Sequence, residues 1–172
     1  MSADGDRPTG NVLVMAPAMS DGKTEACYEL LTGVDPAATD LLRVVSHRSP
    51  ERLVEEWESQ VGTQPANTVI VGVDDRVQSG TLGNDGPRVD EGNLRVLAAN
   101  PNDLTGLGME LNNALEALSG TDNRPFVCFD SVTALLQFVD VENAYQFSKI
   151  MGHFFMRPHP TPHRDEEYCE RG

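Results

Sequence analysis

Gly22, Lys23 and Thr24 stand in succession where a short apolar run gives way to a helix-like segment. The apolar run covers residues 11–16 and is long enough for a buried strand, and the helix-like segment covers residues 25–31. When a strand, a loop and a helix follow one another, the backbone N–H groups at the start of the helix can hold a phosphate. The lysine then reaches the β- and γ-phosphates and the threonine hydroxyl binds Mg²⁺. The sequence therefore predicts a P-loop that binds ATP with Mg²⁺ through these three residues.

Two neighbouring residues work against phosphate binding. Pro17 stands where the motif has its first glycine, and proline fixes φ near −65° and lacks an N–H donor. Asp21 comes directly before Gly22, where it faces the bound phosphates. A carboxylate about 4 Å from a phosphate charge costs about 4 kcal/mol at an effective dielectric constant of about 20, before screening. We therefore expect weak nucleotide binding.

Asp130 is the second candidate for chemistry, because it directly follows the apolar run at residues 126–129. An aspartate just beyond a strand can reach a neighbouring P-loop and hold Mg²⁺. Asp130 could equally cap a helix that starts near Val132. A Gly-Lys-Thr helix start followed about a hundred residues later by a strand and an aspartate is the order of a nucleotide-binding α/β domain. The combination favours the magnesium role.

The elements that must position these residues alternate between strands and helices, which predicts βαβ units in a mainly parallel sheet with helices on both faces. Lys23 and Asp130 should lie at the carboxyl edge of this sheet, where open α/β sheets bind ligands. The expected strands cover residues 11–16, 41–46, 68–73, 94–98 and 126–129, and the expected helices cover 23–31, 49–60, 103–118, 132–139 and 142–155.

The boundaries of the predicted domain follow from composition. Residues 1–10 form a flexible lead-in, residues 11–155 form one α/β domain, and residues 156–172 form a polar tail that we expect to be disordered. Residues 74–92 are polar and rich in glycine and predict a long surface loop.

The chain is strongly acidic, with 27 Asp and Glu against 13 Lys and Arg and a formal net charge of −14. Such a charge repels nucleic-acid phosphates and acidic membranes, so neither is an expected partner. An acid-rich and lysine-poor composition is typical of proteins from salt-loving archaea, where salt screens the self-repulsion. An ordinary acidic mesophilic protein is the alternative.

The sequence favours a protein that resides in the reducing cytoplasm. The N-terminus has no apolar segment of the signal-peptide kind, and no apolar run reaches the length of a membrane span. Cys27, Cys128 and Cys169 are odd in number and far apart, and they match no disulfide framework or zinc spacing. Cys27 and Cys128 lie in apolar segments and are interpreted as small core residues.

Histidines near the C-terminus raise the question of a metal site. A zinc site could in principle form from His153, His159, His163 and Cys169. Their spacing is loose and the segment is rich in proline and charge, so incidental histidines in a disordered tail are the favoured interpretation.

Several stretches resemble a known family. FVCFDSVTALLQFVD is similar to the Walker-B strand and following helix of RecA/KaiC-like ATPases, and RVVSHRSPERLVEEW resembles the second strand and helix of the KaiC branch. NVLVMAPAMSDGKTEACYELL, NDLTGLGMELNNAL and VCFDSVTALLQFVDVENAYQF together resemble a haloarchaeal family of RecA/KaiC-like proteins with degenerate Walker motifs. The resemblance spans residues 11–155. It implies a three-layer α/β/α fold of the RecA/KaiC-like P-loop NTPase kind, truncated at the C-terminal edge of the sheet.

The resemblance also shows what this chain lacks. KaiC-like enzymes carry a pair of glutamates just after the second strand, which activate the attacking water. This chain has His47 and Arg48 in that region, and the nearby Glu51 lies within the expected helix. His47 could act as a base, although a histidine at a strand end is more often merely part-buried. No catalytic residue is therefore assigned.

Two classes of function fit these residues. The favoured one is a regulatory or scaffold protein that binds nucleotide weakly or not at all. It would act through a protein partner or a homo-oligomer, in signalling or transcriptional control. The alternative is a Mg²⁺-dependent ATPase that uses Lys23, Thr24 and Asp130.

Overall fold

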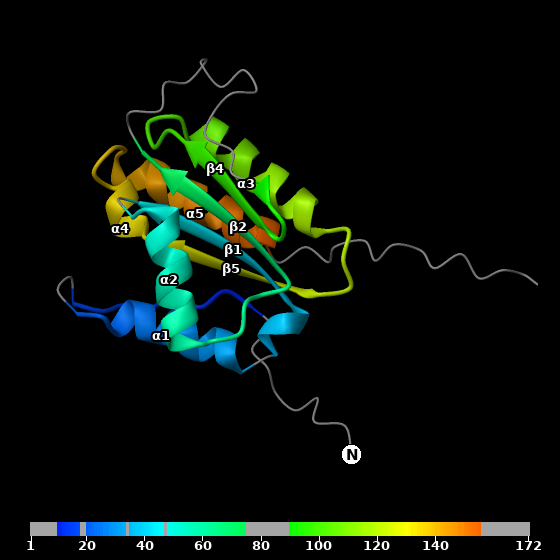
Figure 1. The fold of residues 1–172 in the computed structure, drawn as a ribbon. Coiled ribbons are helices and arrows are strands. Elements are labelled where there is room, and N and C mark those ends of the chain that lie inside the picture. The colour runs from blue at the N-terminus through cyan, green and yellow to red at the C-terminus, as the bar shows by residue number, and fades with distance from the viewer. Residues whose placement is uncertain (1–9, 18–19, 34, 47, 75–89, 156–172) are drawn as a thin grey trace, which may run out of the picture.

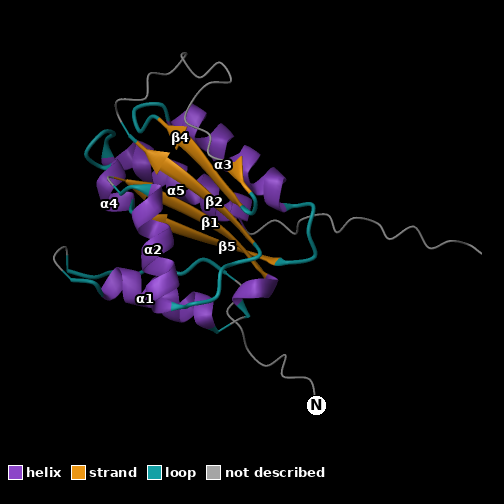
Figure 2. Ribbon diagram, viewed as in Figure 1, coloured by secondary structure: helices purple, strands orange, loops and turns teal. Residues whose placement is uncertain are grey.

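Four parallel strands form the centre of the structure, and a short fifth strand pairs antiparallel at one edge (Figures 1 and 2). The computed structural model describes residues 10–17, 20–33, 35–46, 48–74 and 90–155. The strands lie in the spatial order β3-β4-β2-β1-β5. Their bounds are β1 Thr39–Ser46, β2 Asn67–Val73, β3 Asp90–Glu91, β4 Leu94–Ala99 and β5 Arg124–Asp130.

Helices cover both faces of this sheet (Figure 1). α1 (Gly22–Thr32) and α2 (Pro50–Gln60) lie on one face, and α3 (Leu104–Leu118), α4 (Val132–Leu135) and α5 (Val141–Phe155) lie on the other. Successive side chains of a strand point to opposite faces. Leu42 and Val44 of β1 accordingly pack with α3 and α5, whereas Leu41 and Val45 pack with α1 and α2. The predicted α/β class, with a mainly parallel sheet between helices, is confirmed.

Residues 11–16 differ from the prediction, because they form no strand. Val12, Leu13 and Met15 are 56%, 80% and 89% exposed, and Asn11 Nδ2 donates to the Gly152 carbonyl of α5 over 3.0 Å. An apolar run becomes a strand only when it pairs with another strand, and sequence pattern alone does not supply the partner. Within the described residues the sheet therefore ends at β5. Its residues 126–129 are only half-buried, where a buried strand was expected.

The predicted helix at residues 132–139 is also shorter than expected. α4 ends at Leu135. The N–H of Leu136 still bonds to the Val132 carbonyl, but the N–H groups of Gln137 and Phe138 bond to carbonyls three residues back, and the chain turns toward α5. The predicted terminal segments, apart from residue 10, and most of the predicted loop at 74–92 lie outside the described residues. No helix in the described ranges is long and apolar enough to cross a lipid bilayer.

Asp40 is a buried acidic residue at the amino end of the sheet, just after a 3₁₀ turn at Pro36–Ala38. Its carboxylate accepts hydrogen bonds from Asn67 Nδ2 at 2.7 Å and Asn123 Nδ2 at 3.0 Å, and from the hydroxyl of Thr121. Asn67 begins β2, while Thr121 and Asn123 precede β5. One side chain thus joins β1 to the segments that enter both neighbouring strands, and so helps to set where β5 begins.

Candidate functional site

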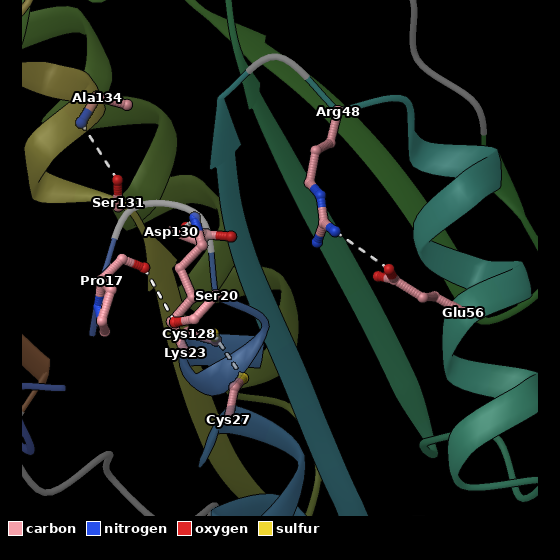
Figure 3. Close-up of polar contacts among 10 residues, drawn as sticks. All are labelled: Pro17, Ser20, Lys23, Cys27, Arg48, Glu56, Cys128, Asp130, Ser131 and Ala134. Carbon is pink, nitrogen blue, oxygen red and sulfur yellow. Dashed lines mark hydrogen bonds and ion pairs between the residues drawn. The ribbon is translucent and has the colours of Figure 1, made fainter. Parts of the chain in front are cut away.

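Lys23 and Asp130 meet at the carboxyl edge of the sheet (Figure 3). Lys23 lies in the first turn of α1 and Asp130 is the last residue of β5. The Lys23 Nζ atom is 2.9 Å from Asp130 Oδ1, and the two side chains are 47% and 16% exposed. The structure therefore brings together two of the residues that the sequence singled out, from positions 107 residues apart.

A tight turn leads into α1. The Pro17 carbonyl accepts hydrogen bonds from the Ser20 N–H at 3.0 Å and the Ser20 hydroxyl at 2.9 Å, and residues 18 and 19 lie outside the described residues. The Asp21 carbonyl accepts the first helical bonds, from Thr24 and Glu25, but the Asp21 side chain makes no capping hydrogen bond. Pro17 thus lacks a donor for a phosphate but contributes its carbonyl to the turn.

The position of Asp130 is explained by its neighbour Ser131. The Ser131 hydroxyl accepts a hydrogen bond from the Ala134 N–H at 3.2 Å and so caps α4. The alternative in which Asp130 caps this helix is therefore wrong. Because the next residue caps α4, the carboxylate of Asp130 is left to pair with Lys23.

The Lys23–Asp130 pair is suited to exchange its partners. A solvent-exposed ion pair contributes roughly 0–1 kcal/mol to stability, so Lys23 loses little by turning to a phosphate. Mg²⁺ is commonly bound by one or two carboxylates, while phosphates and waters supply the other oxygens. Asp130 and the hydroxyl of the half-buried Thr24, in the same turn as Lys23, are oxygen ligands of this kind. The residues present therefore fit a Mg²⁺ that arrives with ATP.

Arg48 and Glu56 form a second ion pair beyond the end of β1, which no sequence pattern predicted. Arg48 Nη2 lies 3.1 Å from Glu56 Oε1 of α2, and Figure 3 shows the pair across β1 from Lys23. Glu51, in the first turn of α2, is exposed, and His47 lies outside the described residues. The nearby Glu56 carboxylate is held by an arginine and is not aimed at the Lys23 site.

Cys27 and Cys128 lie directly below the Lys23–Asp130 pair (Figure 3). Their Sγ atoms are 2.6 Å apart and form a hydrogen bond between free thiols. This hydrogen bond lowers the pKa of Cys27, against the effect of burial, and the charge of Arg43 lowers it further. The same hydrogen bond and burial raise the pKa of Cys128. The two cysteines are half-buried and face each other, so their interpretation as ordinary core residues was incomplete.

The structure offers no support for a metal site of histidines and cysteines. Within the described ranges no group of three or more His, Cys, Asp or Glu side chains could hold a metal ion. Of the four residues considered from sequence, His153 is exposed on α5, and His159, His163 and Cys169 lie outside those ranges.

Comparison with known proteins places the chain in a family. Residues 9–165 match the model of a family of unknown function (DUF7504), and because this match covers most of the chain, the protein belongs to that family. Comparisons with curated proteins and with solved structures gave no match.

Proposed function

We propose that this protein is a RecA/KaiC-like regulatory or scaffold protein that binds ATP with Mg²⁺ weakly and does not hydrolyse it at a useful rate. Nucleotide binding would use Gly22, Lys23, Thr24 and Asp130, and regulation would act through protein contacts in signalling or transcriptional control. The observation that carries this proposal is the 2.9 Å contact between Lys23 Nζ and Asp130 Oδ1 at the carboxyl edge of a parallel sheet.

Each residue has a defined task in this proposal. Without nucleotide, Lys23 neutralises the half-buried Asp130 carboxylate. When a phosphate reaches the start of α1, Nζ of Lys23 turns to the β- and γ-phosphate oxygens, which leaves Asp130 and Thr24 as oxygen ligands for Mg²⁺. Pro17 offers no N–H group and Asp21 adds a negative charge, so binding is weak.

Hydrolysis needs a further group that positions and deprotonates a water, and general-base assistance contributes about 10²- to 10⁴-fold. The described carboxylate closest in sequence to the expected glutamate pair is Glu51, which is exposed. The next one considered, Glu56, is held in an ion pair with Arg48. Both features support a site that retains its nucleotide as a slow switch or structural ligand.

An exposed apolar segment supports the proposed protein contacts. Val12, Leu13, Val14 and Met15 are consecutive and are each 39% or more exposed. Such a run on a surface marks a binding site more often than chance. A second copy of the chain or another protein that covers this segment would bury it next to the start of α1, and so could respond to a bound nucleotide.

The test is a titration of the full chain with labelled ATP and Mg²⁺ in high-salt buffer, followed by a phosphate-release assay. Lys23→Ala should weaken binding by roughly 10- to 150-fold, because hydrogen bonds to charged groups contribute about 1.5–3 kcal/mol. The matched control is Lys149→Ala, since Lys149 is the only other lysine and is exposed on α5.

Three outcomes would contradict the proposal. Absence of ATP binding in the wild-type chain would remove the nucleotide function. Equal loss in Lys23→Ala and Lys149→Ala would show that binding is not at this site. Turnover near about 1 s⁻¹ that Lys23→Ala abolishes would instead establish the Mg²⁺-dependent ATPase.

A further inference from the structure

Cys27 and Cys128 occupy matched positions on the two elements that carry the ion pair. Cys27 follows Lys23 by four residues, so both point from the same side of α1. Cys128 precedes Asp130 by two residues, so both lie on the same face of β5. At 2.6 Å the two Sγ atoms are farther apart than in a disulfide bond, which is about 2.05 Å long, but near enough for a small shift of the side chains to let the bond form. The fold therefore places two thiols at bonding range between α1 and β5.

Arg43 provides a second, independent observation at this place. It pairs in register with Cys128 across β1 and β5, and it is only 4% exposed. Its Nε has no hydrogen-bond partner among the described residues, and its Nη1 makes a long contact of 3.4 Å with the Tyr28 hydroxyl.

This buried guanidinium also has no carboxylate within ion-pair distance among the described residues. A buried positive charge without an anion is costly. A thiolate at Cys27 would supply the missing negative charge beside Arg43, and a thiolate is the reactive form of cysteine. The surroundings of the two thiols thus favour a reactive thiolate at Cys27 rather than two inert core cysteines.

We propose that Cys27 and Cys128 form a reversible thiol–disulfide site that exchanges with a disulfide oxidant and fastens α1 to β5. Neither cysteine is fully buried. The site does not depend on nucleotide binding, and either proposal can fail without the other.

The exchange balances in two steps. The Cys27 thiolate attacks one sulfur of the oxidant RSSR, which forms a Cys27–SR mixed disulfide and releases RS⁻. Cys128 then gives up its proton, and its sulfur attacks the Cys27 sulfur, which forms the Cys27–Cys128 disulfide and releases the second RS⁻. The two cysteines lose two electrons, the oxidant gains them, and the two thiol protons end on two molecules of RSH.

The bond would strengthen a thinly packed junction. α1 contributes Tyr28 and Leu31 to the buried core, and its apolar contacts are with β1, α2 and β5. A disulfide from residue 27 to residue 128 closes a loop of about a hundred residues, for which chain-entropy estimates are near the upper end of disulfide stabilisation. Oxidation should therefore raise the melting temperature by on the order of 10 °C.

The experiment uses the full chain with Cys169→Ser, so that the third cysteine cannot pair. The protein is equilibrated without nucleotide in buffers of reduced and oxidised glutathione, quenched with acid, alkylated and mapped by mass spectrometry. We expect the Cys27–Cys128 disulfide to form in the native chain. It should form at a ratio of oxidised to reduced glutathione at least about 100-fold lower than the urea-unfolded chain needs, because a disulfide that stabilises the native fold is itself favoured by that fold. The oxidised chain should melt higher than the reduced chain.

Cys27→Ser and Cys128→Ser are the matched controls, because each removes one thiol and keeps a side chain of similar size. Neither should form an internal disulfide, and neither should show a melting temperature that rises on oxidation. The proposal is overturned if the native chain forms no Cys27–Cys128 disulfide under conditions that oxidise the unfolded chain. It is equally overturned if the bond forms without raising the melting temperature.

Discussion

Replacing Asp40 by alanine should destabilise the protein far more than replacing it by asparagine. Asp40 is 1% exposed and accepts hydrogen bonds from Asn67, Asn123 and Thr121. Alanine removes the acceptor and leaves three polar groups without their partner. Asparagine keeps an oxygen for the two amides, and its NH₂ can donate to Thr121 Oγ1, whose own proton then goes to the Leu118 carbonyl at 3.2 Å.

The size of the effect follows from these contacts. Hydrogen bonds to a charged group contribute about 1.5–3 kcal/mol each, but the three donors are half-buried and regain part of this from water. We therefore expect Asp40→Ala to lower the free energy of unfolding by about 3–5 kcal/mol, as for a broken buried polar network. Asp40→Asn should stay within about 1 kcal/mol of the wild type, because it also relieves the burial of a charge.

The assay is urea unfolding in high-salt buffer, followed by the fluorescence of Trp57, which is the single tryptophan and is buried on α2. Asp122→Ala is the control, since Asp122 is exposed in the same loop as Thr121 and Asn123 and should change stability by less than about 0.5 kcal/mol. Equal losses for Asp40→Ala and Asp40→Asn would refute the reasoning, because they would show that the charge matters and the hydrogen bonds do not.

Two further predictions concern the site and the surface. Asp130→Ala should change the free energy of unfolding by less than about 1 kcal/mol, because Lys23 is 47% exposed, yet it should abolish the dependence of ATP affinity on Mg²⁺. Calorimetric titration with and without Mg²⁺ measures this, and a retained Mg²⁺ dependence would exclude Asp130 as a ligand. The formal net charge of −14 should make the fold weaken as salt is withdrawn, because unscreened like charges repel. Thermal unfolding followed by circular dichroism in low and multimolar KCl tests this, and equal stability in both would contradict a halophilic adaptation.

Local patterns explain why most elements could be predicted from the sequence. The β-branched run at residues 68–73 and the Ser49-Pro50 start of a helix each contain their own signal, and they became β2 and α2. The place of Asp130 at the carboxyl edge was also predictable, because the carboxyl ends of parallel strands share one edge of a sheet. Lys23 meets it there as expected, although the strand expected before Lys23 does not form.

Features that depend on residues distant in the sequence could not be predicted from local patterns. Residues 11–16 have the composition of a strand, but strand formation requires pairing, and no described strand pairs with them. Asp40 looks like part of a polar turn until Asn67 and Asn123 are placed beside it. The two cysteines are 101 positions apart, so only the three-dimensional structure shows that they face each other.

The absence of a strand beyond β5 within the described residues gives the contacts between α1 and β5 their importance. β5 is hydrogen-bonded on one side only, to β1, and the start of α1 follows a turn rather than a paired strand. The Lys23–Asp130 ion pair and the Cys27–Cys128 contact are two side-chain ties between α1 and this edge of the sheet. A ligand that draws Lys23 away removes one of these ties, and oxidation makes the other covalent. If both act on the position of α1, linkage requires that each alter the other's equilibrium by the same factor, so the proposed nucleotide site and the thiol site would be coupled through this single helix.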